Sequence, residues 1–503
     1  MAGSGGAPPE VLETGVPNLD RVLGGGLLGR SLAMVIGTPG TGKTLLAQQI
    51  AFHNAALGAT ALYLTGYAET HDKLLSHSRG LTFVQPELIG SRMQFGSLPG
   101  LLREGPQQTV DAIVATARAE QARLVVLDGF RSMRGYLGDD LAAAHFLYSL
   151  GAKLAVLGAT TLVVVEGEPD DSARYPELTV CDVILALRRE RTDSRHRRVL
   201  EVLKARGASH LSGTHPFLIN HAGLTVFPRF ESVVAASQPA WQPGRAPFGI
   251  AALDALIGGG LNVGTATLLA GSPGVGKTTL GLHFVAEGVR AGEPVLFCGF
   301  MEGPAQLLEK ARLFGMDLSA ADASDQLRLL VLAGHELEAD QVASVLADDI
   351  ERRGVRRLVI DSAAELQRGL GAEARAPEFL SALVSYLRAR AVTAYLTLDI
   401  ALIVGPALEL AGTPLSVLAE NLVLLRQVEY RGTLHRVLSV LKMRFSGYDP
   451  AIYEYTVSPG HGIRLVGPAP LGEGLLTGVP RLVPEPLARA ESAGDQGQVW
   501  PRS

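Results

Sequence analysis

The most informative stretch of this sequence is GVPNLDRVLGGGLLGRSLAMVIGTPGTGKT at residues 15–44, which returns as GIAALDALIGGGLNVGTATLLAGSPGVGKT at residues 249–278. The two copies align without a gap at an offset of 234 residues. Further along, Asp128 and Asp361 each end an apolar run and lie 233 residues apart. One such match can arise by chance, but several in the same order at nearly one offset indicate an internal duplication.

Each copy ends in the pattern G-x-x-x-x-G-K-[ST], which is typical of a loop that binds the phosphates of a nucleotide. In both places the pattern follows an apolar run and precedes a helical one, as this motif requires. Glycines let backbone N–H groups turn toward phosphate oxygens, and the N-terminus of the next helix adds a favourable dipole. The predicted nucleotide-binding residues are Gly37, Thr38, Pro39, Gly40, Thr41, Gly42, Lys43 and Thr44, and Gly271, Ser272, Pro273, Gly274, Val275, Gly276, Lys277 and Thr278.

The same motif predicts a magnesium site in each copy. Lys43 and Lys277 are expected to reach the β- and γ-phosphates of ATP, and the threonine that follows each lysine offers a hydroxyl to Mg²⁺. An acid at the carboxyl end of a neighbouring buried strand can hold the same ion through water. The predicted metal-binding residues are Thr44, Asp128, Thr278 and Asp361.

Short apolar runs alternate with longer helical patterns in both halves. The alternation predicts an α/β fold of two tandem domains, each a mostly parallel twisted sheet flanked by helices, with antiparallel hairpins at the end of each half. The predicted domains are residues 1–235 and 236–466, joined near a linker at 228–247 that holds four prolines. Residues 467–503 lack a sustained apolar period and are expected to form a disordered tail.

Composition narrows the class of protein. A net charge of −5 gives no sign of general attraction to nucleic acid, and 47% apolar residues argue against disorder. Cys181 and Cys298 lie in apolar runs and are expected to be buried core residues rather than a disulfide or zinc ligands. With no signal peptide and no apolar run long enough to cross a bilayer, we expect a cytoplasmic protein without membrane contact.

With its glycine-rich lead-in, two P-loops, strand-ending aspartates and late K-x-R triplets, the sequence resembles the KaiC family of RecA-like ATPases over about residues 11–229 and 245–466. Many double-domain relatives share these motifs, so the resemblance is to the family rather than to the circadian clock protein itself. It implies two RecA-like domains that bind Mg-ATP and hydrolyse it slowly, changing a conformational or signalling state. It also implies a homohexameric ring with ATP between subunits, and a signalling partner of unknown identity.

The resemblance further implies a role for two cationic triplets. In a ring, Lys204 and Arg206, or Lys442 and Arg444, would enter the neighbouring subunit's site and contact the γ-phosphate. A cation supplied in this way stabilises the charge of the transition state of phosphoryl transfer. The alternative is a solvated pair of charges on a strand.

The sequence departs from the family at the residues that orient or activate the attacking water. The family carries two adjacent glutamates there, whereas this chain has Ala68 before Glu69 and Met301 before Glu302. A general base must lie within hydrogen-bond reach of its water. If the missing glutamate is that base, the protein is a nucleotide-gated scaffold with little hydrolysis; if Glu69 and Glu302 serve as catalytic residues, it remains an ATP hydrolase.

The second half also differs at the place where the clock protein phosphorylates itself on adjacent Ser and Thr. Here Ser416 occupies the serine position, and Val417 has no hydroxyl. A two-site phosphorylation cycle of that form is therefore excluded. Single-site autophosphorylation on Ser416 stays open, against the simpler interpretation of a loop serine that precedes a strand.

An arginine-rich cluster at residues 187–198, LRRERTDSRHRR, is expected to form a hairpin tip. It supports a third hypothesis, a DNA-dependent ATPase related to recombinases or helicases, because a shared fold does not fix function. The cluster lacks interleaved aromatic residues on which bases can stack. A solvated or intersubunit role is therefore favoured, and no nucleic-acid partner is expected.

Overall fold

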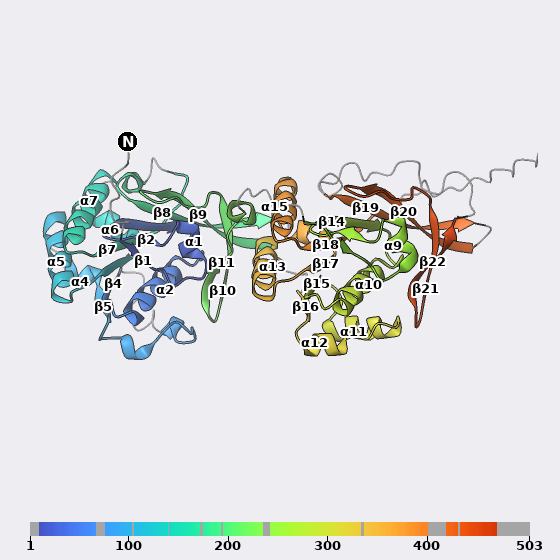
Figure 1. Cartoon of the computed structure of the whole chain (residues 1–503). Helices are drawn as coiled ribbons and strands as arrows, with labels where there is room; N and C mark the ends of the chain where they lie inside the picture. The colour runs from blue at the N-terminus through green and yellow to red at the C-terminus, as the bar shows by residue number, and fades with distance from the viewer. Residues whose placement is uncertain are drawn as a thin grey trace, which may run out of the picture. The chain divides into compact units, whose positions relative to one another are not determined.

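A computed structural model describes residues 10–66, 76–102, 105–138, 140–171, 175–192, 195–234, 242–332, 337–400, 419–430 and 433–469 (Figure 1). Contacts between residues divide the chain into two compact units. Unit 1 consists of Met1–Ala240, Leu332–Val355 and Ala364–Arg390, and unit 2 of Trp241–Val331, Arg356–Ala363 and Ala391–Ser503. Each unit contains one nine-stranded sheet.

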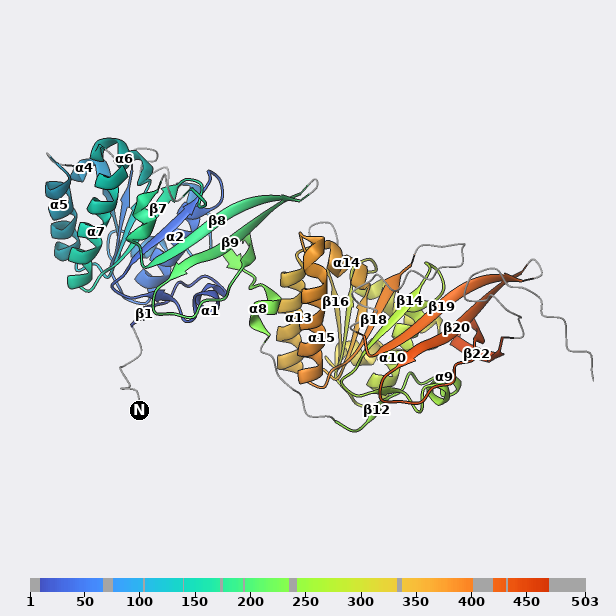
Figure 2. The same ribbon diagram turned by 90° about the horizontal axis from the view of Figure 1, so that it is seen from above.

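The sheet of unit 1 is parallel in its centre and antiparallel at one end. A long antiparallel hairpin of β8 and β9 joins the two parts (Figure 2). In spatial order the strands are β5 (Met93–Ser97), β4 (Ala61–Thr65), β6 (Leu124–Asp128), β7 (Thr160–Glu166), β3 (Leu32–Gly37), β8 (Val183–Thr192), β9 (Arg195–Ala205), β10 (Thr214–Asn220) and β11 (Gly223–Val226).

The sheet of unit 2 repeats this order strand for strand. Its strands are β16 (Leu327–Val331), β15 (Val295–Gly299), β17 (Arg357–Asp361), β18 (Thr393–Asp399), β14 (Ala266–Gly271), β19 (Asn421–Tyr430), β20 (Thr433–Met443), β21 (Tyr453–Ser458) and β22 (Gly462–Pro468). The duplication and the predicted fold class of two tandem, mostly parallel sheets flanked by helices are thus confirmed.

Both faces of the central sheet in unit 1 are buried, which explains its continuous apolar strands. Along β3, Ala33 and Val35 pack on one side with helix α2 (Lys43–Ala56). The alternate residues Met34 and Ile36 pack on the other side with α5 (Pro106–Ala119), α6 (Arg131–Leu137) and α7 (Asp140–Val156). Period-two alternation along one strand therefore feeds two separate cores.

In unit 2, helix α10 (Lys277–Arg290) packs in the same way on one face of its sheet. Leu280 and Phe284 of this helix join a core that includes Leu269 of β14 and Val359 of β17. Three smaller helices of this unit are α9 (Ala251–Leu256), α11 (Pro304–Leu313) and α12 (Ser319–Ala323). The helix that follows each P-loop therefore anchors that loop to a buried core.

Three further helices, α13 (Ala339–Arg353), α14 (Ala363–Arg368) and α15 (Ala376–Ala389), belong wholly or mostly to unit 1 by their contacts. The short helix α8 (Phe230–Val233) packs against them, with the Phe230 ring 5.9 Å from Phe379 and 5.6 Å from Tyr386. Units of contact need not coincide with sequence repeats, so the borders at residues 235 and 466 stay a prediction.

The repeated aspartates of the lead-in have a structural role. Asp20 accepts a hydrogen bond from the backbone N–H of Thr14 at 3.0 Å, and Asp254 accepts one from Phe248 at 2.7 Å. Burial raises the pKa of both carboxyl groups. Asp20 is the second residue of helix α1 (Leu19–Leu23). The three residues that follow this helix, Gly24 to Gly26, all have positive φ, which residues with a side chain rarely adopt.

Three further predictions concern the C-terminal end of the chain, contact with membranes and the two cysteines. Strand β22 ends at Pro468, so the prediction of a disordered tail is wrong for residues 467 and 468; from residue 470 onward the predicted tail lies outside the described residues. Among the helices that the structure describes, none has the length and apolarity needed to cross a membrane. Cys181 and Cys298 are both buried and free, as predicted.

Candidate functional site

The first P-loop joins β3 to α2 at the carboxyl edge of the unit 1 sheet. Gly40 and Gly42 have φ of 76° and 103°, a conformation that favours glycine. Lys43 is 9% exposed, and its Nζ donates to the carbonyl oxygen of Thr38 at 2.8 Å. Burial lowers the pKa of this lysine, while the charges of Glu166 and Asp128 oppose the shift. The loop thus folds around its own lysine.

The second P-loop has nearly the same backbone. Gly274 and Gly276 have φ of 79° and 103°. Lys277 is 7% exposed, and its Nζ donates to the carbonyl oxygens of Gly271 and Ser272, both at 2.9 Å. Two loops of one geometry, each at a strand-to-helix turn, are what phosphate binding requires.

The first glycine of each motif is needed for close packing as well. A Cβ on Gly37 would lie 2.2 Å from the carbonyl oxygen of Leu187, and one on Gly271 would lie 2.7 Å from that of Leu425. Both distances are too short for a side chain against backbone. The cradle is therefore shaped by the neighbouring strand, and its residues fit a bound phosphate.

Each unit brings the predicted metal-binding pair together. The Thr44 hydroxyl donates to Asp128 Oδ1 at 3.3 Å, and the Thr278 hydroxyl donates to Asp361 Oδ2 at 2.6 Å. In the part of the chain that the structure describes, no group of three or more His, Cys, Asp and Glu residues could hold a metal ion. The pair therefore suits Mg²⁺ that takes its other ligands from phosphate and water.

A second hydroxyl holds the other carboxylate oxygen, but from a different strand in each unit. The Tyr63 hydroxyl of β4 donates to Asp128 Oδ2 at 2.7 Å, and the Thr397 hydroxyl of β18 donates to Asp361 Oδ1 at 2.5 Å. By strand position, the counterpart of Tyr63 in unit 2 is Phe297, which has no hydroxyl. In unit 2 the second hydroxyl comes from Thr397 instead. Both arrangements fix the carboxylate that faces the P-loop.

An acid at the end of the strand beside each P-loop was missed by the sequence analysis. Glu166 ends β7 opposite Gly37, and Asp399 ends β18 opposite Gly271. Asp399 forms an ion pair with Lys277 at 2.7 Å, whereas Glu166 pairs with Arg131 at 2.5 Å. The available signal was the same one that identified Asp128, an acid directly after an apolar run.

Two cavities adjoin the first P-loop. One has a volume of about 320 Å³ and extends toward His77 and Leu81, and the other has about 240 Å³ and reaches Asp128 and Glu166. Gly40, Lys43 and Thr44 line both of them. The loop therefore borders open space on the side of the magnesium pair and on the side of α2.

Of the two predicted catalytic glutamates, the structure describes only Glu302. Glu302 lies between β15 and α11, where it forms an ion pair with Lys310. Lys310 thus competes with any water for the carboxylate. Glu69 and its neighbour Ala68 lie outside the described residues, as does Ser416.

The first K-x-R triplet lies away from the P-loop of its own unit. Lys204 pairs in register with Ile184, which in turn lies beside Met34, three residues before Gly37. At about 3.3 Å per residue this separates the triplet from the loop by about 10 Å along the strand. Lys204 Nζ instead donates to the carbonyl oxygen of Thr179 at 2.9 Å.

The second triplet has the same placement. Lys442 pairs with Leu422, which lies beside Leu268 of β14, again three residues before the P-loop glycine. Its Nζ donates to the carbonyl oxygen of Ala419 at 2.7 Å, and burial lowers its pKa. The structure therefore does not bring either triplet to the P-loop of its own half.

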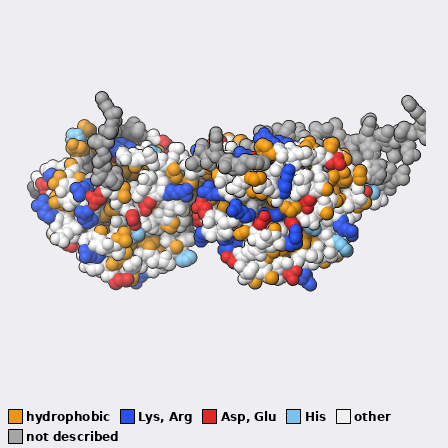
Figure 3. Space-filling model, in the orientation of Figure 1, with side chains coloured by type: hydrophobic (Ala, Val, Ile, Leu, Met, Phe, Trp, Pro, Cys, Tyr) orange, Lys and Arg blue, Asp and Glu red, His pale blue; other side chains and the backbone are white. Residues whose placement is uncertain are grey.

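The arginine cluster forms part of the β8–β9 hairpin, as predicted. Arg188 forms ion pairs with Asp170 at 2.5 Å and Glu201 at 2.6 Å, and Arg197 pairs with Glu338 at 3.1 Å. On the face shown in Figure 3, Lys and Arg are interspersed with Asp and Glu. Two of the six arginines of the cluster are thus engaged in ion pairs within unit 1, which weakens the DNA-binding hypothesis.

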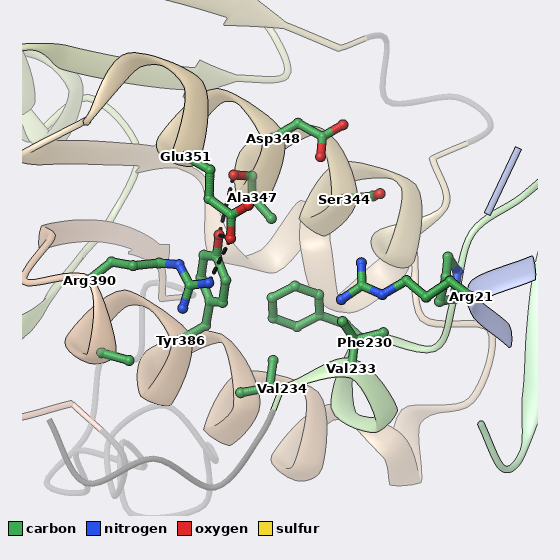
Figure 4. Close-up of a pocket in the computed structure, with 12 residues that line it drawn as sticks. Arg21, Phe230, Val233, Val234, Ser344, Ala347, Asp348, Glu351, Tyr386 and Arg390 are labelled. Atoms are coloured by element: carbon green, nitrogen blue, oxygen red, sulfur yellow. Dashed lines mark hydrogen bonds and ion pairs between the residues drawn. The ribbon is translucent and has the colours of Figure 1, made fainter. Parts of the chain in front are cut away.

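A separate pocket of about 260 Å³ lies in unit 1 beside α8, α13 and α15. Figure 4 shows Phe230 and Tyr386 in it, with Arg21 and Arg390 on opposite sides. Arg390 already pairs with Glu351 at 2.6 Å and stacks on Tyr386. The pocket contains no P-loop residue, so it is separate from the two candidate nucleotide sites.

Comparison with known proteins gives these sites a family context. A family model described as "ATPase: KaiC" matches residues 12–231 and 246–469. The circadian clock oscillator protein KaiC of Synechococcus elongatus is 29% identical over 461 residues, which cover 89% of this chain and 87% of that protein. The circadian clock protein KaiC3 of Synechocystis is 27% identical over 485 residues, which cover 94% of each chain.

Proposed function

Because the chain belongs to the KaiC family of ATPases, we propose that each of its two P-loops binds ATP with Mg²⁺ and that slow hydrolysis changes the state of a ring. The observation that carries the proposal is the pairing, in both units, of a buried P-loop lysine with a threonine–aspartate hydrogen bond. We also propose a cytoplasmic location, where ATP and Mg²⁺ are both available.

The residues of each site divide the work of binding. Lys43 and Lys277 would exchange their bonds to loop carbonyls for phosphate oxygens, a stronger charge-assisted contact. Asp128 and Asp361 would hold Mg²⁺ together with the adjacent threonines. The ion would supply positive charge against the charge that develops on the phosphates.

We further propose that the K-x-R triplets act on a neighbouring subunit in a homohexameric ring. This proposal is supported by the distance of each triplet from the P-loop of its own half. Lys204, Arg206, Lys442 and Arg444 would then contact the γ-phosphate held by the next chain. A head-to-tail contact of this kind forms a ring when its rotation between successive subunits closes.

Nucleotide binding at equilibrium tests the proposal. The wild-type chain should bind two molecules of ATP per chain in the presence of Mg²⁺, Lys43→Ala or Lys277→Ala should bind one, and the double variant none. Mass in solution should rise when ATP and Mg²⁺ are added to the wild-type chain. A double variant that binds as much ATP as the wild type would overturn the two-site assignment.

A nucleotide-gated scaffold with little hydrolysis is the second candidate. Met301 in place of a carboxylate and the ion pair of Glu302 with Lys310 favour it. In this case ATP would still bind both sites and drive assembly. Turnover of the wild-type chain no higher than that of the Lys43→Ala/Lys277→Ala variant would identify the scaffold.

Single-site autophosphorylation on Ser416 is a separate proposal that rests on the sequence position alone. Intact-protein mass after incubation with ATP and Mg²⁺ checks it. A gain of one phosphate that disappears in Ser416→Ala would support it, and no gain would end it.

A further inference from the structure

The lysine of the second P-loop has an anionic partner before any phosphate arrives. Asp399 Oδ1 lies 2.7 Å from Lys277 Nζ, and the lysine side chain is 8% exposed while the aspartate side chain is 49% exposed. The pair therefore has one buried and one solvated end. A phosphate oxygen that binds Lys277 competes with this carboxylate for the same ammonium group.

The first site has an acid at the same position but uses it differently. Glu166 occupies the place of Asp399, because each residue pairs in register with the first glycine of its P-loop. The carboxylate of Glu166 forms its ion pair with Arg131, which is 58% exposed. Lys43 makes its hydrogen bond to Thr38 instead. Lys277 also donates to carbonyl oxygens of its own loop, so the two sites differ in the partner of the strand-ending acid, which is the P-loop lysine in the second site and Arg131 in the first.

The difference has a source in the sequence. Arg131 stands three residues after Asp128, and the corresponding residue, three after Asp361, is Ala364. Alanine offers no charge that could draw Asp399 away from the P-loop. The arginine-to-alanine difference, together with the shorter side chain of Asp399 relative to Glu166, accompanies the different ion pairs.

We propose that Asp399 is an internal competitor for phosphate at the second P-loop, which makes this site bind nucleotide more weakly than it would without the carboxylate. Arg131 weakens the same competition at the first site by engaging Glu166, although the charge of Glu166 still acts on Lys43. The proposal rests on the proposed function, since it presupposes that both loops bind nucleotide. It predicts that removing the charge of Asp399 lowers the Kd of the second site for nucleotide.

The second site can be measured alone in the full chain by using the Lys43→Ala background and a fluorescent ATP analogue with Mg²⁺. Asp399→Asn keeps the size of the side chain and removes its charge. Because one end of the pair is solvated, we expect a moderate effect, a decrease of Kd by about threefold to tenfold. An unchanged or increased Kd would overturn the proposal.

The first site supplies the mirror experiment in the Lys277→Ala background. Arg131→Ala should free Glu166 and raise the Kd of the first site by about threefold, and adding Glu166→Gln to that variant should restore the affinity. An Arg131→Ala variant that Glu166→Gln does not rescue would contradict the role given to the arginine.

A control separates this proposal from the proposed function. The Lys43→Ala/Lys277→Ala chain should show no binding of the analogue. Binding that persists there would mean that the P-loops are not the nucleotide sites, whereas its loss together with an unchanged Kd in Asp399→Asn would reject the competitor alone.

Discussion

Met301 stands where the resemblance to the family leads us to expect a glutamate, and the residue is 84% exposed. An exposed position accepts a charged side chain at little cost in stability. The neighbouring Glu302 is engaged by Lys310. A glutamate therefore fits at position 301, and it would supply a carboxylate that is not already paired with Lys310.

We predict that Met301→Glu raises ATP turnover at the second site, measured in the Lys43→Ala background, by about tenfold or more, because general-base catalysis typically contributes at least that factor. Met301→Gln is the matched control, of equal size without charge, and should leave turnover unchanged. Equal rates for the two variants would mean that the family glutamate is not the group that limits hydrolysis here.

The two cysteines give a second prediction at this scale. Both thiols are fully buried, and burial raises the pKa of each to about 12. Since the thiolate is the reactive form, neither should react with a thiol reagent at pH 8 in the native protein, and both should react in denaturant. Rapid labelling of native Cys298 would show that β15 opens on the time scale of the assay.

Among the elements, the β8–β9 hairpin contributes an unusual buried carboxyl contact. Arg197 of β9 lies 3.1 Å from Glu338, which directly precedes α13. Burial nevertheless raises the pKa of Glu338 to about 7, because the arginine only partly offsets the loss of water. Nearby, Arg375 forms ion pairs with Glu231 and Asp340. Glu338, the carboxyl group with the raised pKa, belongs to this charged cluster.

The raised pKa sets the sign of a pH effect. In the unfolded chain Glu338 ionises near pH 4.5, so between about pH 4.5 and 7 the native state holds more protons than the unfolded state. The free energy of unfolding should therefore fall as pH rises through this range, by up to about 3 kcal/mol from this group. Denaturant unfolding followed at several pH values should show a smaller fall for Glu338→Gln, and identical curves would contradict the assignment.

For the molecule as a whole, the decisive question is whether a site uses residues from two chains. The register of both sheets places each K-x-R triplet about 10 Å along the strand from the P-loop of its own half. The register within each sheet therefore does not bring these cations to the P-loop of their own half. A ring would supply a nucleotide from the neighbouring chain.

Mixing variants tests this directly. In the Lys43→Ala background, chains with Lys277→Ala and chains with Lys442→Ala/Arg444→Ala should each lack turnover at the second site. Mixed rings should recover part of it, because an intact P-loop then meets an intact triplet from its neighbour. Chains that carry all of these substitutions should give no recovery when mixed with either parent alone. Rates that merely add would show that the triplets do not act across subunits.

Motifs that carry their own backbone geometry could be predicted from the sequence. The P-loops, the Thr–Asp pairs and the duplicated, mostly parallel sheets follow from glycines at fixed spacing, strand-ending acids and the repeat. Such signals are local, and each of them occurs twice because the chain contains an internal duplication. The arginine-rich hairpin was predicted for the same reason, since two apolar runs flank it.

Contacts between distant strands could not be predicted in this way. That Asp399 faces Lys277, that Thr397 replaces Tyr63 as the second hydroxyl, and that Lys310 engages Glu302 depend on strand order, register and side-chain direction. These are fixed only when the sheets assemble, because residues far apart in the chain become neighbours through packing rather than through spacing. The sequence thus determined that the chain has two nucleotide-binding motifs, and the tertiary structure decided how differently the two are held.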